Sequence, residues 1–182
     1  WTSIDYLINN GYLVRYFWKN DAANFTRIAF VSVLGVGFLP KMPGTFGSIV
    51  ALLILFIPFD SQLILLSAVV AIIIGLLVIG SVEKRHGNDP QFVVIDEVIG
   101  IWLILSVPFI PHSFFWVILG FGLFRLFDIW KPFPIGWLNR HKGALWVIAD
   151  DVLAAGYTIL LLLLLQFALM VSPLVLAYLN SL

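Results

Sequence analysis

Charged residues divide the chain into apolar stretches of different lengths. Residues 61–82 and 152–173 contain no charged side chain, and the second stretch includes the leucine run 160–165. A helix needs about 20 predominantly apolar residues to cross the hydrocarbon core of a bilayer. These two stretches therefore predict two membrane-spanning helices. Four shorter apolar stretches predict further helical pieces, at residues 26–39, 45–59, 92–107 and 113–127.

The stretches fit a helical bundle that crosses the membrane repeatedly. If the chain crosses alternately through the apolar stretches from residue 45 onward, successive connections lie on opposite sides. This arrangement predicts an all-α, polytopic membrane helix bundle with about five spanning or partly spanning helices. Residues 1–26 are polar and aromatic, and we expect them to form an interfacial N-terminal helix or arm. Residues 27–182 would then form one membrane-embedded domain.

The composition supports a membrane protein. Hydrophobic residues make up 62% of the 182 residues and charged residues only 11%, whereas soluble domains carry about 25% charged residues. The formal net charge is zero, so nothing in the overall charge indicates a nucleic-acid partner. The absence of cysteine excludes disulfides, thiolate metal sites and cysteine nucleophiles.

The basic residues fall on one side of the folded arrangement. The opposite turns and the C-terminal tail carry no Lys or Arg, and the positive-inside rule assigns the basic side to the cytoplasm. The basic residues are Lys41, Lys84, Arg85, Arg125, Lys131, Arg140 and Lys142, with Arg15, Lys19 and Arg27 on the N-terminal arm.

Acidic residues gather on the same predicted face. Asp96 and Glu97 interrupt an otherwise apolar run, and a charge at bilayer depth costs at least about 2.5–3.5 kcal/mol. Acids placed at such a cost usually have a function. The face also carries Asp89, Asp128 and the adjacent pair 150–151.

Converging carboxylates repel one another, and a hard divalent cation removes that repulsion. Oxygen donors without cysteine or a well-placed histidine suit Mg²⁺ or Mn²⁺, and Mg²⁺ is commonly held by one or two carboxylates plus phosphate oxygens. We therefore expect Asp96, Glu97, Asp150 and Asp151 to bind Mg²⁺, with Asp128 as a further ligand or general base. The candidate catalytic residues are Asp96, Asp128 and Asp151.

The basic residues nearest to these acids suggest a phosphate-containing substrate. Arg125, Asp128 and Lys131 are spaced three residues apart, which places them on about one face of a helix. A guanidinium can bind two phosphate oxygens at once, and an ammonium adds a point charge. We expect Pro132 and Pro134 to end that helix.

A glycine-containing segment, PGTFGS at 43–48, offers a second candidate phosphate contact. We expect a helix to begin near Gly47, where free N–H groups and the helix dipole favour an anion. Thr45 and Ser48 supply hydroxyl groups. The segment is not a Walker loop, because GxxxxGK[ST] does not occur in the chain.

Each of these residue groups also fits a role without chemistry. The 96–97 acids could be a water-solvated pair at a helix end, and the 150–151 acids could cap a helix N-terminus. The 125–131 segment could be an ordinary ion-pair ladder. An ion- or proton-coupled transporter with an interfacial carboxylate site is the alternative function, although transporter sites usually lie near the midplane between repeats. A CDP-alcohol phosphotransferase would need a DGxxAR segment, which is absent.

Four motifs together resemble the phosphatidylglycerophosphatase A family. They are PGTFGS, DPQFVVIDEVIG, FRLFDIWKPFP and ADDVLAAG, and the resemblance covers about residues 27–170. The positions that match the family pattern are Pro43, Gly44, Thr45, Gly47, Ser48, Asp89, Asp96, Glu97, Gly100, Arg125, Asp128, Lys131, Pro132, Pro134, Asp150 and Asp151.

The resemblance implies a Mg²⁺-dependent lipid phosphatase in the bacterial inner (cytoplasmic) membrane. Such an enzyme hydrolyses phosphatidylglycerophosphate to phosphatidylglycerol and inorganic phosphate. Its partners would be the phospholipid substrate and the surrounding membrane lipids, and the sequence leaves a homo-oligomer open. Direct water attack and an aspartyl-phosphate intermediate remain alternatives.

Overall fold

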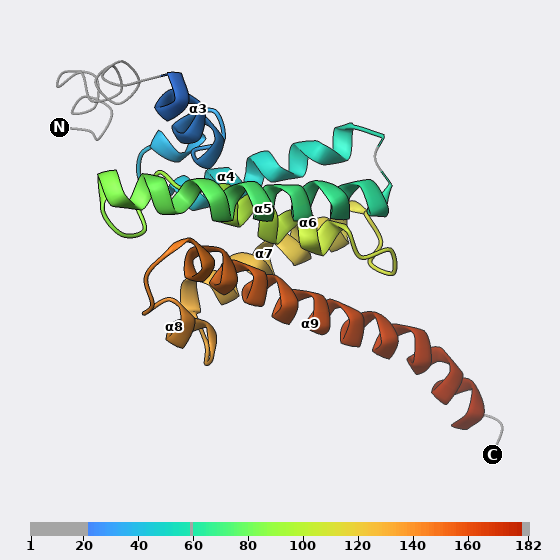
Figure 1. The fold of residues 1–182 in the computed structure, drawn as a ribbon. Coiled ribbons are helices and arrows are strands. Elements are labelled where there is room, and N and C mark those ends of the chain that lie inside the picture. The colour runs from blue at the N-terminus through green and yellow to red at the C-terminus, as the bar shows by residue number, and fades with distance from the viewer. Residues whose placement is uncertain (1–21, 59, 180–182) are drawn as a thin grey trace.

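The computed structural model describes residues 22–58 and 60–179, so most of the predicted N-terminal arm lies outside the described residues. Within these residues the chain forms only helices, which confirms the all-α class (Figure 1). The first of them, α3, passes through the predicted boundary at residues 26 and 27 without a break. The elements are α3 (Ala22–Val31), η1 (Val36–Phe38), α4 (Pro43–Ala51), η2 (Leu52–Phe56), α5 (Ser61–His86), α6 (Ile95–Leu105), α7 (Phe114–Trp130), α8 (Ile135–Leu138) and α9 (Ala144–Leu179).

Two helices are long and apolar enough to cross a membrane, as the sequence predicted. They are α5, with 26 residues, and the Ala144–Ser172 part of α9, with 29 residues. At 1.5 Å per residue, α5 is about 39 Å long, which exceeds the hydrocarbon thickness of about 30 Å. Large apolar side chains cover its outer face, and Leu77 is 77% exposed. A continuous apolar surface of this kind marks a membrane or protein contact.

The remaining described helices have at most 17 residues, fewer than the about 20 that a spanning helix needs, so the prediction of about five spanning helices is not confirmed. The stretch 45–59 forms α4, which ends at Ala51, and then the tighter η2. The stretch 92–107 begins with a turn and non-helical residues, and only 11 of its residues form α6. Eleven helical residues extend about 16 Å, roughly half of the hydrocarbon core.

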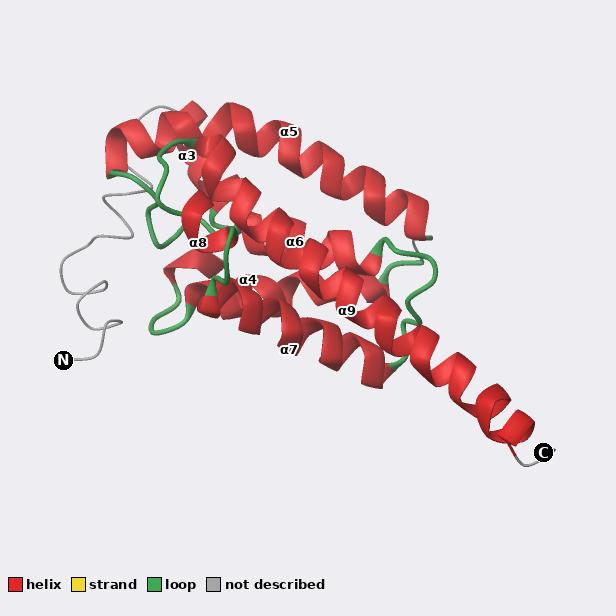
Figure 2. Ribbon diagram, turned by 90° about the horizontal axis from the view of Figure 1, so that it is seen from below, coloured by secondary structure: helices red, strands yellow, loops and turns green. Residues whose placement is uncertain are grey.

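α6 lies at the centre of the bundle and packs against α4, α5 and α9 (Figure 2). The fully buried Phe124 of α7 lies against Gly100 of α6, where a Cβ would overlap the ring. The indole Nε1 of Trp102 donates a hydrogen bond of 3.1 Å to the Ala51 carbonyl at the end of α4. These contacts hold α6 in place, and its first turn carries Asp96 and Glu97.

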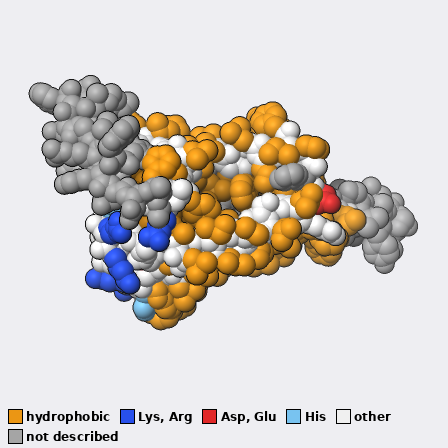
Figure 3. All heavy atoms as spheres, turned by 45° about the horizontal axis from the view of Figure 1, so that its top comes forward, with side chains coloured by type: hydrophobic (Ala, Val, Ile, Leu, Met, Phe, Trp, Pro, Cys, Tyr) orange, Lys and Arg blue, Asp and Glu red, His pale blue; other side chains and the backbone are white. Residues whose placement is uncertain are grey.

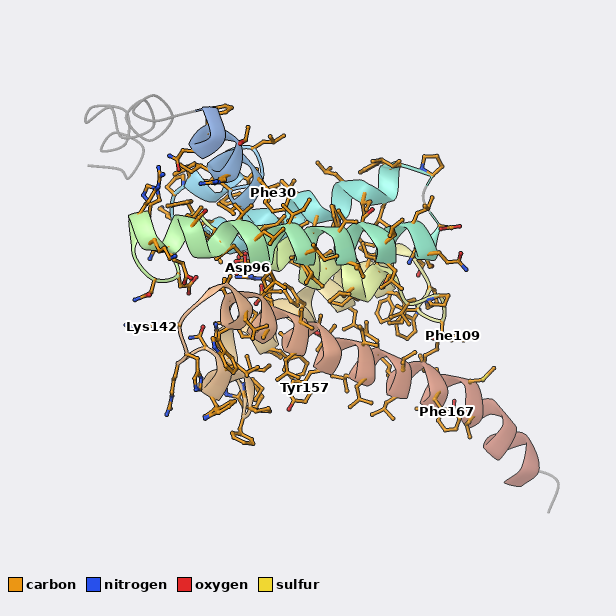
Figure 4. The ribbon with its side chains drawn as sticks, in the orientation of Figure 1. Phe30, Asp96, Phe109, Lys142, Tyr157 and Phe167 are labelled. Carbon is orange, nitrogen blue, oxygen red and sulfur yellow. The ribbon has the colours of Figure 1, made fainter. Side chains whose placement is uncertain are left out.

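The charged and apolar surfaces are separated along the molecule. In Figure 3 the visible Lys and Arg side chains gather at one end, and apolar side chains cover most of the remaining described surface. Lys142 lies at the same end, whereas Phe109, in the turn between α6 and α7, lies at the opposite end (Figure 4). This arrangement agrees with the alternation of turns that the sequence predicted.

Candidate functional site

Three acidic side chains from two helices meet inside the bundle. Asp96 and Glu97 belong to the first turn of α6, and Asp151 belongs to α9. Each of the three offers one carboxylate oxygen, and these oxygens all lie within 4.8 Å of one another. Figure 4 shows Asp96 near the end of the bundle at which α9 begins. We call Asp96, Glu97 and Asp151 the acid cluster.

Burial excludes a simple water-solvated pair at a helix end. Asp96 is 9% exposed and Asp151 3% exposed, and the Glu97 side chain is 13% exposed. The dipole of α6 stabilises negative charge in its first turn, but it does not offset the mutual repulsion of three buried carboxylates. The cluster therefore requires a cation or protons to be stable.

A helix-capping role for Asp150 and Asp151 is wrong. The helix was expected to begin at about residue 152, but α9 begins at Ala144, directly after Gly143 with its left-handed φ of 110°. The two acids therefore lie in the second turn of α9, where the backbone N–H groups already have helical partners. Their side chains are free to point into the bundle instead.

A guanidinium from α7 connects the acid cluster to Asp128. Arg125 Nη1 lies 2.7 Å from Asp128 Oδ2 and 3.8 Å from Glu97 Oε1. The Arg125 side chain is 15% exposed and that of Asp128 is 13% exposed. The prediction that these two residues share a helix face is confirmed, because both lie on α7 one turn apart.

Lys131 reaches the site from outside the helix rather than from its face. α7 ends at Trp130, as the two following prolines predicted, and Lys131 is the capping residue, with a left-handed φ of 48°. Its Nζ lies 2.6 Å from Asp150 Oδ2, 2.7 Å from Asn139 Oδ1 and 4.0 Å from Asp128 Oδ1. Burial lowers the pKa of Lys131, but the hydrogen bond to Asp150 and the surrounding carboxylates outweigh it, so the pKa is raised. Lys131 is therefore cationic at neutral pH.

Gly44 lies directly against Glu97 of the acid cluster. The expected helix start near Gly47 is wrong. α4 begins at Pro43, so the free N–H groups of its first turn belong to residues 44 and 45. A Cβ on Gly44 would overlap Glu97 Oε1 and lie 3.3 Å from Arg125 Nη1. This close approach depends on the packing of α4 on α6 and could not be seen in the spacing of the motif.

The other predicted phosphate contacts on α4 lie in different surroundings. Gly47 faces Val94, since a Cβ there would lie 2.9 Å from the Val94 Cβ. Ser48 is fully buried, and its hydroxyl donates a 2.9 Å hydrogen bond to the Gly44 carbonyl. Thr45 is half-buried in the first turn of α4. A phosphate role for Thr45, Gly47 and Ser48 therefore stays a prediction.

Asp96 Oδ1, Glu97 Oε2 and Arg125 Nε are among the buried polar atoms at the site that lack a hydrogen-bond partner within the described residues. Buried polar atoms are normally paired, so orphaned donors and acceptors side by side indicate a missing ligand. The donors of the acid cluster are all carboxylate oxygens, which suits a hard divalent cation such as Mg²⁺ or Mn²⁺. The residues present therefore fit a metal ion.

Two predicted acids, Asp150 and Asp128, are paired with Lys131 and Arg125, and they lie beside the acid cluster rather than within it. Asp89 is exposed, with a positive φ of 44°, and its backbone N–H donates to Glu83 Oε1 at 3.2 Å.

The sequence does not identify Asn139, the residue that contacts Lys131, because an isolated asparagine after a proline turn carries no recognisable signal.

Comparisons with known proteins identify the family of the chain. The family model described as phosphatidylglycerophosphatase A matches residues 29–166. Phosphatidylglycerophosphatase A of Escherichia coli is 36% identical over 127 residues, covering 66% of this chain and 72% of the relative. The protein of the same name from Haemophilus influenzae is 30% identical over 139 residues, covering 73% and 84%.

A third relative carries a different name. A putative phosphatidylinositol-3-phosphatase of Bacteroides thetaiotaomicron is 37% identical over 136 residues, covering 70% of this chain and 86% of the relative. No solved structure matches the chain.

The fold, the site and the relatives define a helical phosphatase with two helices that can cross a membrane. The chain belongs to the phosphatidylglycerophosphatase A family, as the sequence motifs indicated. The family match gives no support to the transporter alternative.

Proposed function

We propose that this protein is a Mg²⁺-dependent lipid phosphatase that hydrolyses phosphatidylglycerophosphate to phosphatidylglycerol and inorganic phosphate. The observation that carries the proposal is the acid cluster with Arg125 and Lys131 beside it. Carboxylates that hold a cation, next to side chains that bind anions, are well suited to the transfer of a phosphoryl group to water. The names of two relatives support the choice of lipid.

Each group has a distinct role in this proposal. Asp96, Glu97 and Asp151 would hold the cation, whose chemistry is to polarise the phosphoryl group and shield its charge. Arg125 and Lys131 bind phosphate oxygens, and the first turn of α4 adds backbone donors at Gly44 and Thr45.

Asp128 and Asp150 hold the two cationic side chains in place. Asp128 keeps its pairing with Arg125 until substrate arrives, and it then becomes available as general base or nucleophile. Asp150 is committed to Lys131, so we assign it to positioning Lys131 and no longer to the metal.

The site would face the cytoplasm at the inner surface of a bacterial membrane. The basic end of the molecule supports this orientation through the positive-inside rule (Figure 3). In this arrangement α5 and α9 cross the bilayer, and α4, α6 and α7 are partly spanning helices of a multi-pass bundle. The short α6 would leave Asp96 and Glu97 slightly below the headgroups, within reach of a lipid phosphate.

The test is release of inorganic phosphate from phosphatidylglycerophosphate by the purified full chain, with Mg²⁺ or with EDTA. Phosphatidylinositol 3-phosphate is the comparison substrate, since one relative carries that name. We expect Mg²⁺-dependent release from phosphatidylglycerophosphate, with Asp96→Asn and Asp151→Asn each reducing it below detection. Asp60→Asn is the matched control, because Asp60 caps the far end of α5 and asparagine caps equally well.

Three outcomes would contradict the proposal. Full turnover in EDTA would reject the metal, and full turnover by both active-site variants would reject the site. Cleavage of phosphatidylinositol 3-phosphate alone would keep the phosphatase and change the substrate.

A further inference from the structure

We propose that Asn139 is a positioning residue, whose side-chain Oδ1 holds the Lys131 ammonium ready for a phosphate oxygen. This inference rests on the proposed function in taking a phosphate group as the ligand. Asn139 is the exposed capping residue of α8, and its Oδ1 accepts a 2.7 Å hydrogen bond from Lys131 Nζ. Neither the motifs nor the acid cluster includes it.

The ammonium is held between two acceptors from different elements. Asp150 Oδ2 on α9 accepts at 2.6 Å, and Asn139 Oδ1 accepts from the end of α8. Asp128 Oδ1, at 4.0 Å, is beyond hydrogen-bond distance. An ammonium has three N–H donors, so these contacts leave one donor for a ligand oxygen. The Lys131 side chain is 27% exposed, so it is partly accessible from outside the bundle.

The short helix that carries Asn139 is firmly attached to Lys131 and to α9. A Cβ on Gly136 would lie 2.8 Å from the Lys131 carbonyl oxygen, so α8 sits directly on the Lys131 backbone. Ile135, the first residue of α8, is fully buried. The Tyr157 hydroxyl of α9 donates a 3.2 Å hydrogen bond to the Phe133 carbonyl. Asn139 is therefore a fixed acceptor and not part of a loose loop.

The consequence for binding follows from the flexibility of lysine. Its long stem has several rotatable bonds, and positioning by a second acceptor reduces the entropy lost when a ligand is bound. Without Asn139 the ammonium is attracted only toward carboxylates that lie deeper in the site, with Asp150 the nearest of them. Phosphate binding should weaken, whereas the acids and Arg125 stay in place.

A purely structural role would give a different result. If Asn139 only stabilised the end of α8, its loss would affect the protein in the same way whether or not Lys131 is present. The coupling between the two side chains is therefore the quantity to measure, and a double-mutant cycle measures it.

The experiment measures the affinity of the Mg²⁺-loaded full chain for inorganic phosphate by calorimetry, with KM and kcat for phosphatidylglycerophosphate in parallel. We expect Asn139→Ala to raise Kd and KM about tenfold, which corresponds to one hydrogen-bond contribution, and to leave kcat within about twofold. Asn139→Gln, which retains the amide oxygen, should restore most of the affinity. Arg140→Ala, at the neighbouring exposed position, is the control and should bind phosphate normally.

In the Lys131→Met background, Asn139→Ala should have no further effect on Kd. An equal loss in both backgrounds, no loss in either, or no phosphate binding by the unaltered protein would overturn the inference. Failure of the proposed function looks different, because the protein would then bind phosphate with the expected Asn139 dependence and yet leave phosphatidylglycerophosphate intact.

Discussion

The Glu97 carboxylate occupies the space that a side chain on Gly44 would need. A Cβ at that position would overlap Glu97 Oε1 and approach Arg125 Nη1 to 3.3 Å. The start of α4 thus lies in direct contact with Glu97 of the acid cluster and close to the Arg125 guanidinium. Small changes in α4 should therefore be transmitted to the chemistry.

Gly44→Ala should lower phosphate release by about 10- to 100-fold, because displacement of a site group by about 1 Å has effects of that size. The fold should persist, since the added methyl group displaces the end of a side chain. Release assays and unfolding temperature measure the two effects separately. Gly122→Ala on α7 is the matched control, because a Cβ there meets nothing within 4 Å. Unchanged activity in Gly44→Ala would show that α4 does not position Glu97.

Gly100→Ala should destabilise the protein without any direct contact with the acids. The new methyl group would overlap the ring of Phe124, which is fully buried between α6 and α7. Overpacking of this kind costs about 1–3 kcal/mol. Unfolding in detergent measures the loss, and Gly80→Ala, with open space around its Cβ, should show none. Equal stability of the two variants would contradict the packing described for α6.

Lys131→Met should reduce both stability and phosphate release. It removes the partner of Asp150, which is 5% exposed, and a buried acid left without its cation is strongly destabilising. Adding Asp150→Asn should restore the unfolding temperature but not the activity, since the phosphate contact is still missing. Recovery of activity in the double variant would show that Lys131 serves stability alone.

The Lys131–Asp150 ion pair also predicts how the stability of the protein depends on pH. The pKa of Lys131 is raised above its ordinary value of 10.5. The contribution of the protonated Lys131 to the stability of the fold is therefore complete below pH 10.5 and is lost only at higher pH. The difference in unfolding temperature between the unaltered protein and Lys131→Met should therefore be equal at about pH 7 and about pH 9. A difference that disappears by about pH 9 would show that Lys131 loses its proton in the folded protein.

The sequence predicted that Asp96, Glu97 and Asp151 meet, but it placed Asp128 and Asp150 among the metal ligands, whereas they pair with Arg125 and Lys131 beside the cluster. Apolar length located α5 and α9, and the cost of a charge in an apolar run identified Asp96 and Glu97. The predicted start of α9 near residue 152 is wrong, because the apolar residues before the acids at 150–151 extend the helix back to Ala144.

The details missed by the sequence depend on tertiary contacts. The change from α4 to η2 at Leu52 has no proline or glycine to mark it. The approach of Gly44 to Glu97 requires α4 to pack on α6. The contact of Asn139 with Lys131 requires the turn between α7 and α8 to fold back on itself. None of these can be inferred from spacing along one element.

The most direct test of the central claim is the binding of a divalent cation to the acid cluster. Mn²⁺ titration of the purified protein, followed by electron paramagnetic resonance, reports bound and free metal without relying on activity. We predict saturable binding that Asp96→Asn and Asp151→Asn each weaken strongly, that Asp60→Asn leaves unchanged, and that Mg²⁺ competes away. Equal Mn²⁺ binding by the unaltered protein and both acid-cluster variants would contradict the account.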